Sequence, residues 1–238
     1  MTIHSDVQQG TKRWLTLRAG IPTASKFANI VTPSGKPSES RHLYMDQLLA
    51  ERILNQPLET FQSDDMARGS EFEQKAVSSY EFQKDCNTEQ IGFVTNFDDK
   101  VGCSPDRFIV GHPEGALECK CPKPETHVGY LRASLGAGKK YKVQLQGQLW
   151  VCEKEWIDIL SFHPDMPEAL YRVYRDEEFI KQLSASVLSF ARELDEISSE
   201  FTERGYIKLA AEEDATDSSF MTQEDIDWAL GRFQEGRQ

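Results

Sequence analysis

Two acidic residues and a lysine near the middle of the chain have the types and spacing of a metal-ion site that activates water. Eleven residues separate Asp106 from Glu118-Cys119-Lys120, a triplet in an apolar stretch that Pro122 ends. In a strand, alternation sends Cys119 to the apolar face and Glu118 with Lys120 to the other. Charges in a stretch built for burial need a partner. We expect a divalent metal held by Asp106 and Glu118, with Lys120 beside a metal-bound water; the alternative is a solvent-facing Glu–Lys pair.

Two helical segments each carry one polar residue where the helix should face the sheet. Between residues 64 and 83, Glu73 falls inside the apolar stripe, and between 142 and 153, Gln146 projects between two apolar sides. We expect both side chains to complete the site. Each also has a structural interpretation, because a buried carboxylate can pair with a buried arginine or lysine and a core glutamine can bond to backbone groups.

The order of predicted elements indicates an α/β protein with a mixed central sheet flanked by helices. Hydrophobic periodicity predicts long helices and a meander of short strands, and Thr23 is a hydroxyl cap for one short helix. The predicted helices cover residues 38–55, 64–83, 142–153 and 177–201, and the predicted strands cover 91–97, 106–110, 116–121, 156–162 and 170–174.

The composition is that of a globular protein in a reducing cytoplasm. Hydrophobic residues make up 39% and charged residues 28% of the 238 residues. No apolar run is long enough to span a bilayer, and the N-terminus has no signal-peptide core. The five cysteines lack the spacing of a disulfide framework, and no second Cys/His pair stands at ligand spacing. We therefore expect free thiols rather than zinc or an iron–sulfur cluster.

The formal net charge of −12 is unevenly distributed. Residues 210–238 hold eight acids against two arginines, a net −6, whereas the centre carries local basic clusters at Lys120, Lys123, Lys139, Lys140 and Lys142. The total charge thus neither establishes nor excludes a nucleic-acid partner. We predict one domain over residues 1–202 and an acidic extension over 203–238. Thr222 would cap a short amphipathic helix there, and the extension is either disordered or a docking helix for a partner.

Five motifs in a fixed order give the chain a resemblance to a known nuclease family. It resembles the lambda-exonuclease and YqaJ-type viral recombinase nucleases of the PD-(D/E)xK superfamily. The motifs are Trp14 with LRAGIPTAS at 17–25, RGSEFE at 68–73, CSPD at 103–106, LECKCP at 117–122 and QLQGQLW at 144–150. They span residues 14 to about 150; the later strands and long helix fit less specifically, to about residue 202.

The resemblance implies a PD-(D/E)xK restriction-endonuclease-like core and a Mg²⁺-dependent exonuclease. Such an enzyme digests one strand of duplex DNA from the 5′ end towards 3′ and leaves a 3′ single-stranded overhang for recombination. Family members work as ring-shaped homotrimers around DNA with a single-strand annealing protein as partner. A phage-encoded member would act in the host cytoplasm.

The resemblance also assigns roles to individual residues. The metal ligands would be Asp106, Glu118, Glu73 and the Cys119 carbonyl. Lys120 would position the attacking water and Gln146 would complete the catalytic set. Arg18, Ser25 and Ser104 match the family's binding site for a terminal 5′-phosphate; taken alone, Arg18 is a surface salt bridge and Ser25 a helix cap.

The chemistry of phosphodiester hydrolysis agrees with these roles. It needs a hydroxide and a stabilised leaving oxygen, and two Mg²⁺ ions about 4 Å apart supply both. Hard carboxylate and carbonyl oxygens suit Mg²⁺ or Mn²⁺, so Cys119 would contribute its backbone with its sulfur turned to the core. The Arg18 guanidinium can bind two oxygens of a phosphate monoester.

Two other functions remain open, and two departures from the family stand out. The same scaffold serves restriction-like and junction-cleaving endonucleases, although the helicase-linked branch often carries a cysteine cluster that this chain lacks. A non-catalytic DNA-end-binding recombination protein is the alternative from a different class. The extension after about residue 203 has no counterpart in the lambda protein, and the loop around Ser34-Gly35-Lys36 is shorter than the family's groove-reaching loop.

Overall fold

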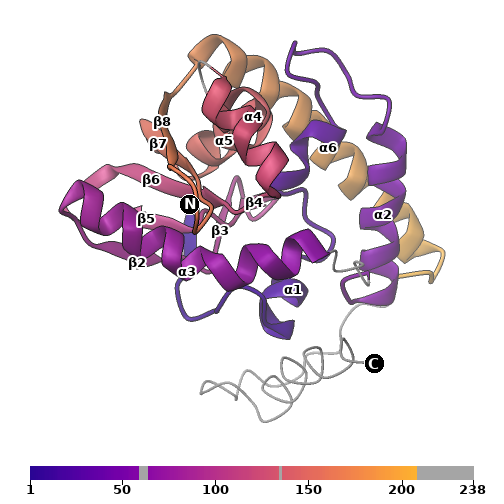
Figure 1. Ribbon diagram of the computed structural model, residues 1–238. Helices are drawn as coiled ribbons and strands as arrows, with labels where there is room; N and C mark the ends of the chain where they lie inside the picture. The colour runs from indigo at the N-terminus through magenta and orange to yellow at the C-terminus, as the bar shows by residue number, and fades with distance from the viewer. Residues whose placement is uncertain (59–63, 134–135, 208–238) are drawn as a thin grey trace.

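A mixed five-stranded sheet organises the part of the chain that carries the motifs (Figure 1). The computed structural model describes residues 1–58, 64–133 and 136–207. The strand order is β2-β5-β6-β7-β8, with β6 and β7 parallel and the other neighbours antiparallel. This confirms the predicted α/β class with a mixed sheet. The strands are β2 (Thr88–Gln90), β5 (Arg107–Ile109), β6 (His112–Lys120), β7 (Trp156–Ser161) and β8 (Ala169–Tyr174).

Helices cover both faces of this sheet (Figure 1). On one face, helix α3 (Asp64–Lys84) packs Ala76, Val77 and Tyr80 against Leu117 of β6. On the other face, α4 (Pro124–Arg132), the short 3₁₀ helix η2 (Gly136–Lys139) and α5 (Lys142–Val151) pack against β7. Because neighbouring residues of a strand point to opposite faces, Leu117 faces α3 and Glu118 faces α5.

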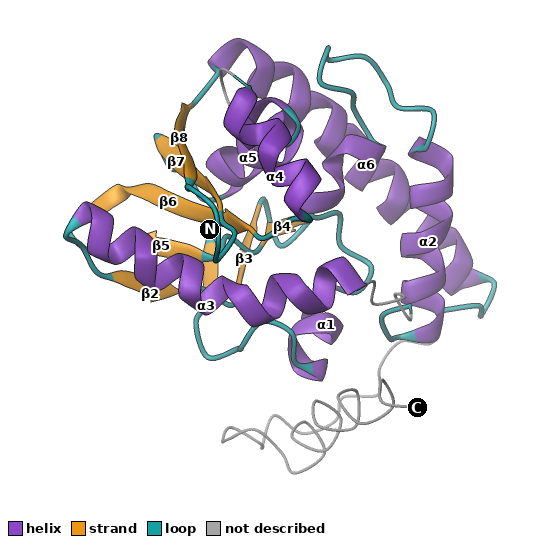
Figure 2. Ribbon diagram, in the orientation of Figure 1, coloured by secondary structure: helices purple, strands orange, loops and turns teal. Residues whose placement is uncertain are grey.

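A second core lies beside the sheet, and Figure 2 shows its helices α2 (Arg41–Leu54) and α6 (Glu177–Glu203) next to each other. This core also contains residues of the 3₁₀ helix η1 (Ala24–Asn29) and of a sheet of order β1-β3-β4. Helix α1 (Lys12–Arg18) lies against β3 and buries none of its residues. Helix α5 joins the two cores, and a Cβ on Gly147 would lie 2.7 Å from Phe27 of η1. The strands are β1 (Thr2–His4), β3 (Phe93–Asn96) and β4 (Val101–Cys103).

The long predicted elements are confirmed, whereas several short ones were missed. The helices α2, α3, α5 and α6 and the strands β3 and β5 to β8 appear within a few residues of their predicted bounds. Strands β1, β2 and β4 and helix α4 were not predicted; α4 begins at Pro124, the first helical position, where proline is well tolerated. Thr23 precedes η1 without making a side-chain cap bond.

The C-terminal prediction falls largely outside the described residues. Helix α6 ends at Glu203, and the structure describes the chain only as far as residue 207. The helix predicted to begin at Thr222 lies beyond it. Among the described helices, none combines the length and apolarity needed to cross a membrane.

Candidate active site

The Asp106 carboxylate is joined directly to strand β6 by a hydrogen bond from a backbone amide. Asp106 stands between Pro105 and the start of β5, and Arg107 pairs in register with Leu117 of β6. The Cys119 amide donates to Asp106 Oδ2 at 2.6 Å. In an extended strand the N–H and C=O of one residue face the same neighbour, so the Cys119 carbonyl also faces the edge that carries Asp106. The predicted carboxylate and carbonyl thus share one corner of the sheet.

Glu118 is almost fully buried and is held by three side chains. It is 3% exposed, on the face of β6 that α5 covers. Gln144 Nε2 donates to its Oε1 at 2.6 Å, Gln148 Nε2 donates to its Oε2 at 2.7 Å, and the Lys120 ammonium also donates to Oε1. Gln144 and Gln148 stand four positions apart on α5, so they lie on the same side of the helix. The two amides and the lysine fix both carboxylate oxygens.

Gln146 does not face this site, which corrects the prediction that it completes the catalytic set. Its Nε2 donates to the Tyr174 carbonyl at 2.8 Å, and its Oε1 accepts from the Asp176 amide at 2.9 Å. The side chain therefore links the end of β8 to the start of α6, which is the structural alternative set out above. The physical reason is that α5 is buried on almost every side, so burial alone could not identify the side that meets Glu118.

The ammonium of Lys120 remains charged between the two carboxylates. Burial opposes the charged form, but the nearby Glu118 and Asp106 carboxylates outweigh it and raise the pKa of Lys120. The ammonium also lies 4.7 Å from the centre of the Tyr141 ring. A lysine in this state donates hydrogen bonds and supplies positive charge, and it is a poor base.

Glu73 and Asp106 add negative charge that Lys120 does not balance. Burial, followed by the proximity of Glu118 and Glu73, raises the pKa of Asp106 well above its ordinary value. Burial also raises the pKa of Glu73, against the lowering effect of Arg107. Arg107 Nη1 lies 3.4 Å from Glu73 Oε1, so the predicted alternative of a buried arginine partner is present. Even so, three carboxylates share the two cations Lys120 and Arg107.

The donor set suits a hard divalent ion. Across the described residues, no three His, Cys, Asp or Glu side chains lie close enough together to form a metal cage. Mg²⁺ rarely uses such a cage, because it binds through one or two carboxylates and completes its octahedron with water and substrate phosphate. Asp106, Glu118 and the Cys119 carbonyl are the oxygens that could hold such an ion here. Burial raises the pKa of the Cys119 thiol and the side chain packs in the α3 core, so its sulfur is unsuited to ligation.

Arg18 and Ser104 form a second polar cluster, and Ser104 precedes Asp106 by two residues in the chain. Arg18 Nη1 donates to Ser104 Oγ at 2.9 Å, and Trp14 Nε1 donates to the same oxygen at 3.0 Å. The guanidinium lies 4.1 Å from the centre of the Trp14 ring. Burial lowers the pKa of Arg18 to about 10, which leaves it charged at neutral pH. The structure therefore brings together two of the three residues predicted to bind a terminal phosphate.

Ser25 reaches this cluster only indirectly. It is exposed, and its Oγ lies 3.5 Å from Thr23 Oγ1. Thr23 in turn pairs with Gly102, two residues before Ser104. Ser25 is thus on a neighbouring segment, while its contact to Arg18 or Ser104 stays a prediction.

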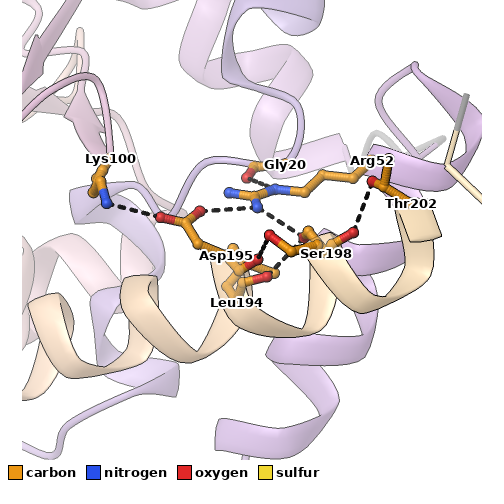
Figure 3. Close-up of polar contacts among 8 residues, drawn as sticks. Gly20, Arg52, Lys100, Leu194, Asp195, Ser198 and Thr202 are labelled. Carbon is orange, nitrogen blue, oxygen red and sulfur yellow. Dashed lines mark hydrogen bonds and ion pairs between the residues drawn. The ribbon is translucent and has the colours of Figure 1, made fainter. Parts of the chain in front are cut away.

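The turn that follows Arg18 is fixed by a network that was not predicted, and Figure 3 shows the part of it that runs from Gly20 through Arg52 to α6. Gly20 has φ +70°, and Glu51 Oε2 accepts its amide at 2.8 Å while Arg52 Nε donates to its carbonyl at 2.9 Å. Arg52 also bonds to Asp195 and Ser198 of α6. The sequence shows that arginines and acids are present at these positions. It does not show that they are partners, because residues this far apart in the chain leave no local sequence pattern.

Solved structures share this architecture. An alkaline exonuclease from Laribacter hongkongensis matches with a TM-score of 0.73 and 25% identity, over 82% of this chain and 98% of that one. The same exonuclease in complex with dAMP gives the same values. A phage-related exonuclease from Haemophilus somnus 129PT shares the fold, with a TM-score of 0.61 and 14% identity over 76% of this chain and 96% of that one.

The sequence itself matches a family model over most of the region that builds the site. No curated protein matches the chain. The model of the YqaJ-like viral recombinase domain matches residues 13–155, which is more than half of the chain. These residues include Arg18, Ser104, Asp106, Glu118 and Lys120. The chain therefore belongs to the YqaJ-like viral recombinase domain family.

Proposed function

We propose that the protein is a Mg²⁺-dependent exonuclease for double-stranded DNA. It digests the 5′-phosphorylated strand from 5′ to 3′ and leaves a 3′ single-stranded overhang for recombination. Membership of a viral recombinase family supports a role in recombination, and the similar structures are described as exonucleases. One of these was solved with dAMP, a nucleoside monophosphate of the kind that stepwise digestion of a strand releases.

The observation that carries the proposal is the closeness of two different polar clusters. The Arg18–Ser104 cluster suits a phosphate monoester, because a guanidinium and a hydroxyl can bind several of its oxygens. Asp106 follows Ser104 by two residues and begins the carboxylate–lysine cluster. An end that is held at one cluster places a nearby phosphodiester at the other. Cleavage next to a bound terminus is the defining property of an exonuclease.

The residues of the carboxylate–lysine cluster divide the chemistry between them. Asp106, Glu118 and the Cys119 carbonyl would hold Mg²⁺, and Glu73 adds a carboxylate at the border. Bound there, Mg²⁺ would lower the pKa of a water and offset charge on the scissile phosphate. Lys120 would donate a hydrogen bond to the attacking water, consistent with its raised pKa. Gln144 and Gln148 would keep Glu118 in place.

We infer from the family resemblance that the chain works as a homotrimer around DNA with a single-strand annealing protein. A ring retains the duplex while successive nucleotides are removed, and the partner coats the overhang. Light scattering on the purified chain tests the assembly: a mass of three chains supports it, and a monomer at working concentration counts against it.

One set of DNA substrates tests the activity. We expect linear duplex with a 5′-phosphate to be digested in Mg²⁺ but not in chelator. Linear duplex with a 5′-hydroxyl should be digested more slowly, and closed circular duplex should resist. Rapid cutting of the closed circle would indicate an endonuclease, and binding of ends without nucleotide release would indicate a scaffold protein.

Arg18→Gln tests the terminal-phosphate site, and Arg13→Gln is its matched control. Both arginines lie on α1, but Arg13 is exposed and pairs with Asp6 rather than with Ser104. Loss of a charge-assisted bond costs about 1.5–3 kcal/mol, or roughly 10- to 150-fold. We expect Arg18→Gln to reduce the preference for 5′-phosphate by this order and Arg13→Gln to leave it unchanged. An unchanged preference in Arg18→Gln would reject the assignment.

A further inference from the structure

The turn that follows Arg18 is held by two neighbouring residues of helix α2. Both backbone groups of Gly20 are bonded there, since its amide donates to Glu51 Oε2 at 2.8 Å and its carbonyl accepts from Arg52 Nε at 2.9 Å. Glu51 is 9% exposed, and a Cβ on Gly20 would lie 2.6 Å from Cγ of Arg52. Helix α2 therefore fixes where the chain runs immediately after Arg18.

Asp195 of α6 holds Arg52 in turn and also pairs with the segment that leads to Ser104. Its Oδ1 accepts from Arg52 Nη1 at 3.0 Å, and its Oδ2 lies 3.0 Å from Lys100 Nζ (Figure 3). Lys100 immediately precedes β4, and β4 leads directly into Ser104. One carboxylate thus connects the two chain segments that carry Arg18 and Ser104.

Arg18 depends on its backbone for its orientation. It is the last residue of α1, and its guanidinium donates to the neutral Ser104 hydroxyl and lies over the Trp14 ring. A guanidinium binds two oxygens of a phosphate only when its plane faces them. A misplacement of about 1 Å can lower a rate about 100-fold. A change in the turn after Arg18 would therefore affect a bound phosphate without any change in the residues that touch it.

We propose that Arg52 and Asp195 are positioning residues that determine how strongly the protein prefers a terminal 5′-phosphate. Arg52 acts through Gly20 on Arg18, and Asp195 keeps Arg52 in place. The inference rests on the proposed function and deepens it, because it adds specificity-determining residues outside the phosphate-binding site. Asp195 also lies beyond residues 13–155, the part of the chain that matches the family model.

A second ion pair between the same two helices provides a matched control. Arg41 Nη2 lies 2.6 Å from Glu193 Oε2. The side chains of this pair are 26% and 45% exposed, close to the 24% and 37% of Arg52 and Asp195. Arg41 begins α2, so it stands about 16 Å from Arg52 along the helix. Loss of either pair removes a contact between α2 and α6, whereas Arg52 also holds the Gly20 carbonyl.

Equilibrium binding in chelator measures the preference without any cleavage. Fluorescence anisotropy gives the dissociation constants for blunt duplex with 5′-hydroxyl and with 5′-phosphate ends, and their ratio is compared between variants of the full chain. Because both constants come from one preparation, a loss of folded protein cancels in the ratio. We expect Arg52→Gln to lower the ratio about 3- to 10-fold, the effect of one lost hydrogen bond. Arg41→Gln should leave the ratio unchanged.

Two further variants show whether the effect follows the proposed route. Asp195→Asn is a gentler change to the same contact, and because the pair is partly exposed it should lower the ratio about 2-fold. If Arg52 acts through Arg18, the ratio in Arg18→Gln/Arg52→Gln equals that in Arg18→Gln alone, because the effects of coupled residues do not add.

Three results would overturn the inference: a further fall in the double variant, an unchanged ratio in Arg52→Gln, or an equal fall in Arg41→Gln. A wild type with no preference for 5′-phosphate would reject the terminal-phosphate site and this inference together. The nuclease activity is tested separately, because a wild type that releases no nucleotides in Mg²⁺ rejects the proposed cleavage and does not alter the binding ratios.

Discussion

Two buried carboxylates on the adjacent parallel strands β6 and β7 have opposite surroundings. Asp158 of β7 is 2% exposed, and Glu118 of β6 is 3% exposed. Asp158 accepts two bonds from Arg172, at 2.8 and 2.9 Å, and one from the Tyr80 hydroxyl at 2.8 Å. One carboxylate is thus paired with one guanidinium through two hydrogen bonds, so the charges in this group balance. Asp158 pairs in register with Leu117, so it faces α3 while Glu118 faces α5.

Glu118, by contrast, belongs to a group whose charges do not balance. Two neutral amides and Lys120 satisfy its oxygens, but burial and the nearby Glu118 carboxylate raise the pKa values of both Asp106 and Glu73. Buried charge without a partner is costly, so such an arrangement persists where a bound cation relieves it. The comparison teaches that burial of an acid does not mark a functional site; the imbalance of charge around it does.

The rate of DNA digestion should show the largest difference between the Glu118 group and the Asp158 group. Lys120→Met keeps the length of the side chain and removes its charge, so we expect DNA digestion to fall by roughly 10²- to 10³-fold, the usual effect of losing one stabilising donor. Circular dichroism should show that the fold persists. Substantial residual digestion would remove Lys120 from the proposed chemistry.

Arg172→Met is the matched change in the balanced group. It leaves Asp158 buried without its cation, and because Arg172 is itself partly exposed we expect a loss of about 1–3 kcal/mol in the free energy of unfolding. Digestion measured well below the unfolding temperature should stay close to wild type. If Arg172→Met lost digestion as completely as Lys120→Met, the distinction between the two groups would fail.

The glutamines of α5 provide a smaller effect on rate. Gln148→Leu removes one of the amides that fix Glu118, and loss of such a supporting group costs about 10- to 100-fold in activity or metal affinity. Gln146→Leu should leave digestion nearly unchanged and lower the melting temperature, because its bonds join β8 to α6. The reverse pattern would restore Gln146 to the catalytic set.

The pH dependence of the unfolding free energy should reveal the surplus of carboxylates around Asp106. A carboxyl with a raised pKa in the folded chain binds a proton where the unfolded chain has released it, so stability falls as pH rises from about 4 upward. In chelator, we expect the wild type to lose more unfolding free energy over this interval than Asp106→Asn, since burial and Glu118 raise the pKa of Asp106. Chemical denaturation at several pH values measures the difference, and parallel curves would contradict it.

The sequence was sufficient where a local pattern determines geometry. Alternation along β6 correctly assigned Cys119 to the core and Glu118 to the opposite face, and the CSPD motif placed Asp106 at the start of a strand. It failed for Gln146, because a helix buried all round offers no unique inward side. Glu51 and Arg52 could not be found, since they bind Gly20 from 31 and 32 residues away.

Manganese binding to the DNA-free chain, followed by the electron paramagnetic resonance signal of free Mn²⁺, tests the central claim most directly. If the surplus of carboxylates near β6 is a metal site, the wild type removes Mn²⁺ from solution at a stoichiometry of one or two ions per chain. Asp106→Asn and Glu118→Gln should weaken this binding, while Asp158→Asn leaves it unchanged. Equal binding by the wild type and Asp106→Asn, or no binding by the wild type with or without a 5′-phosphorylated duplex end, would contradict the account.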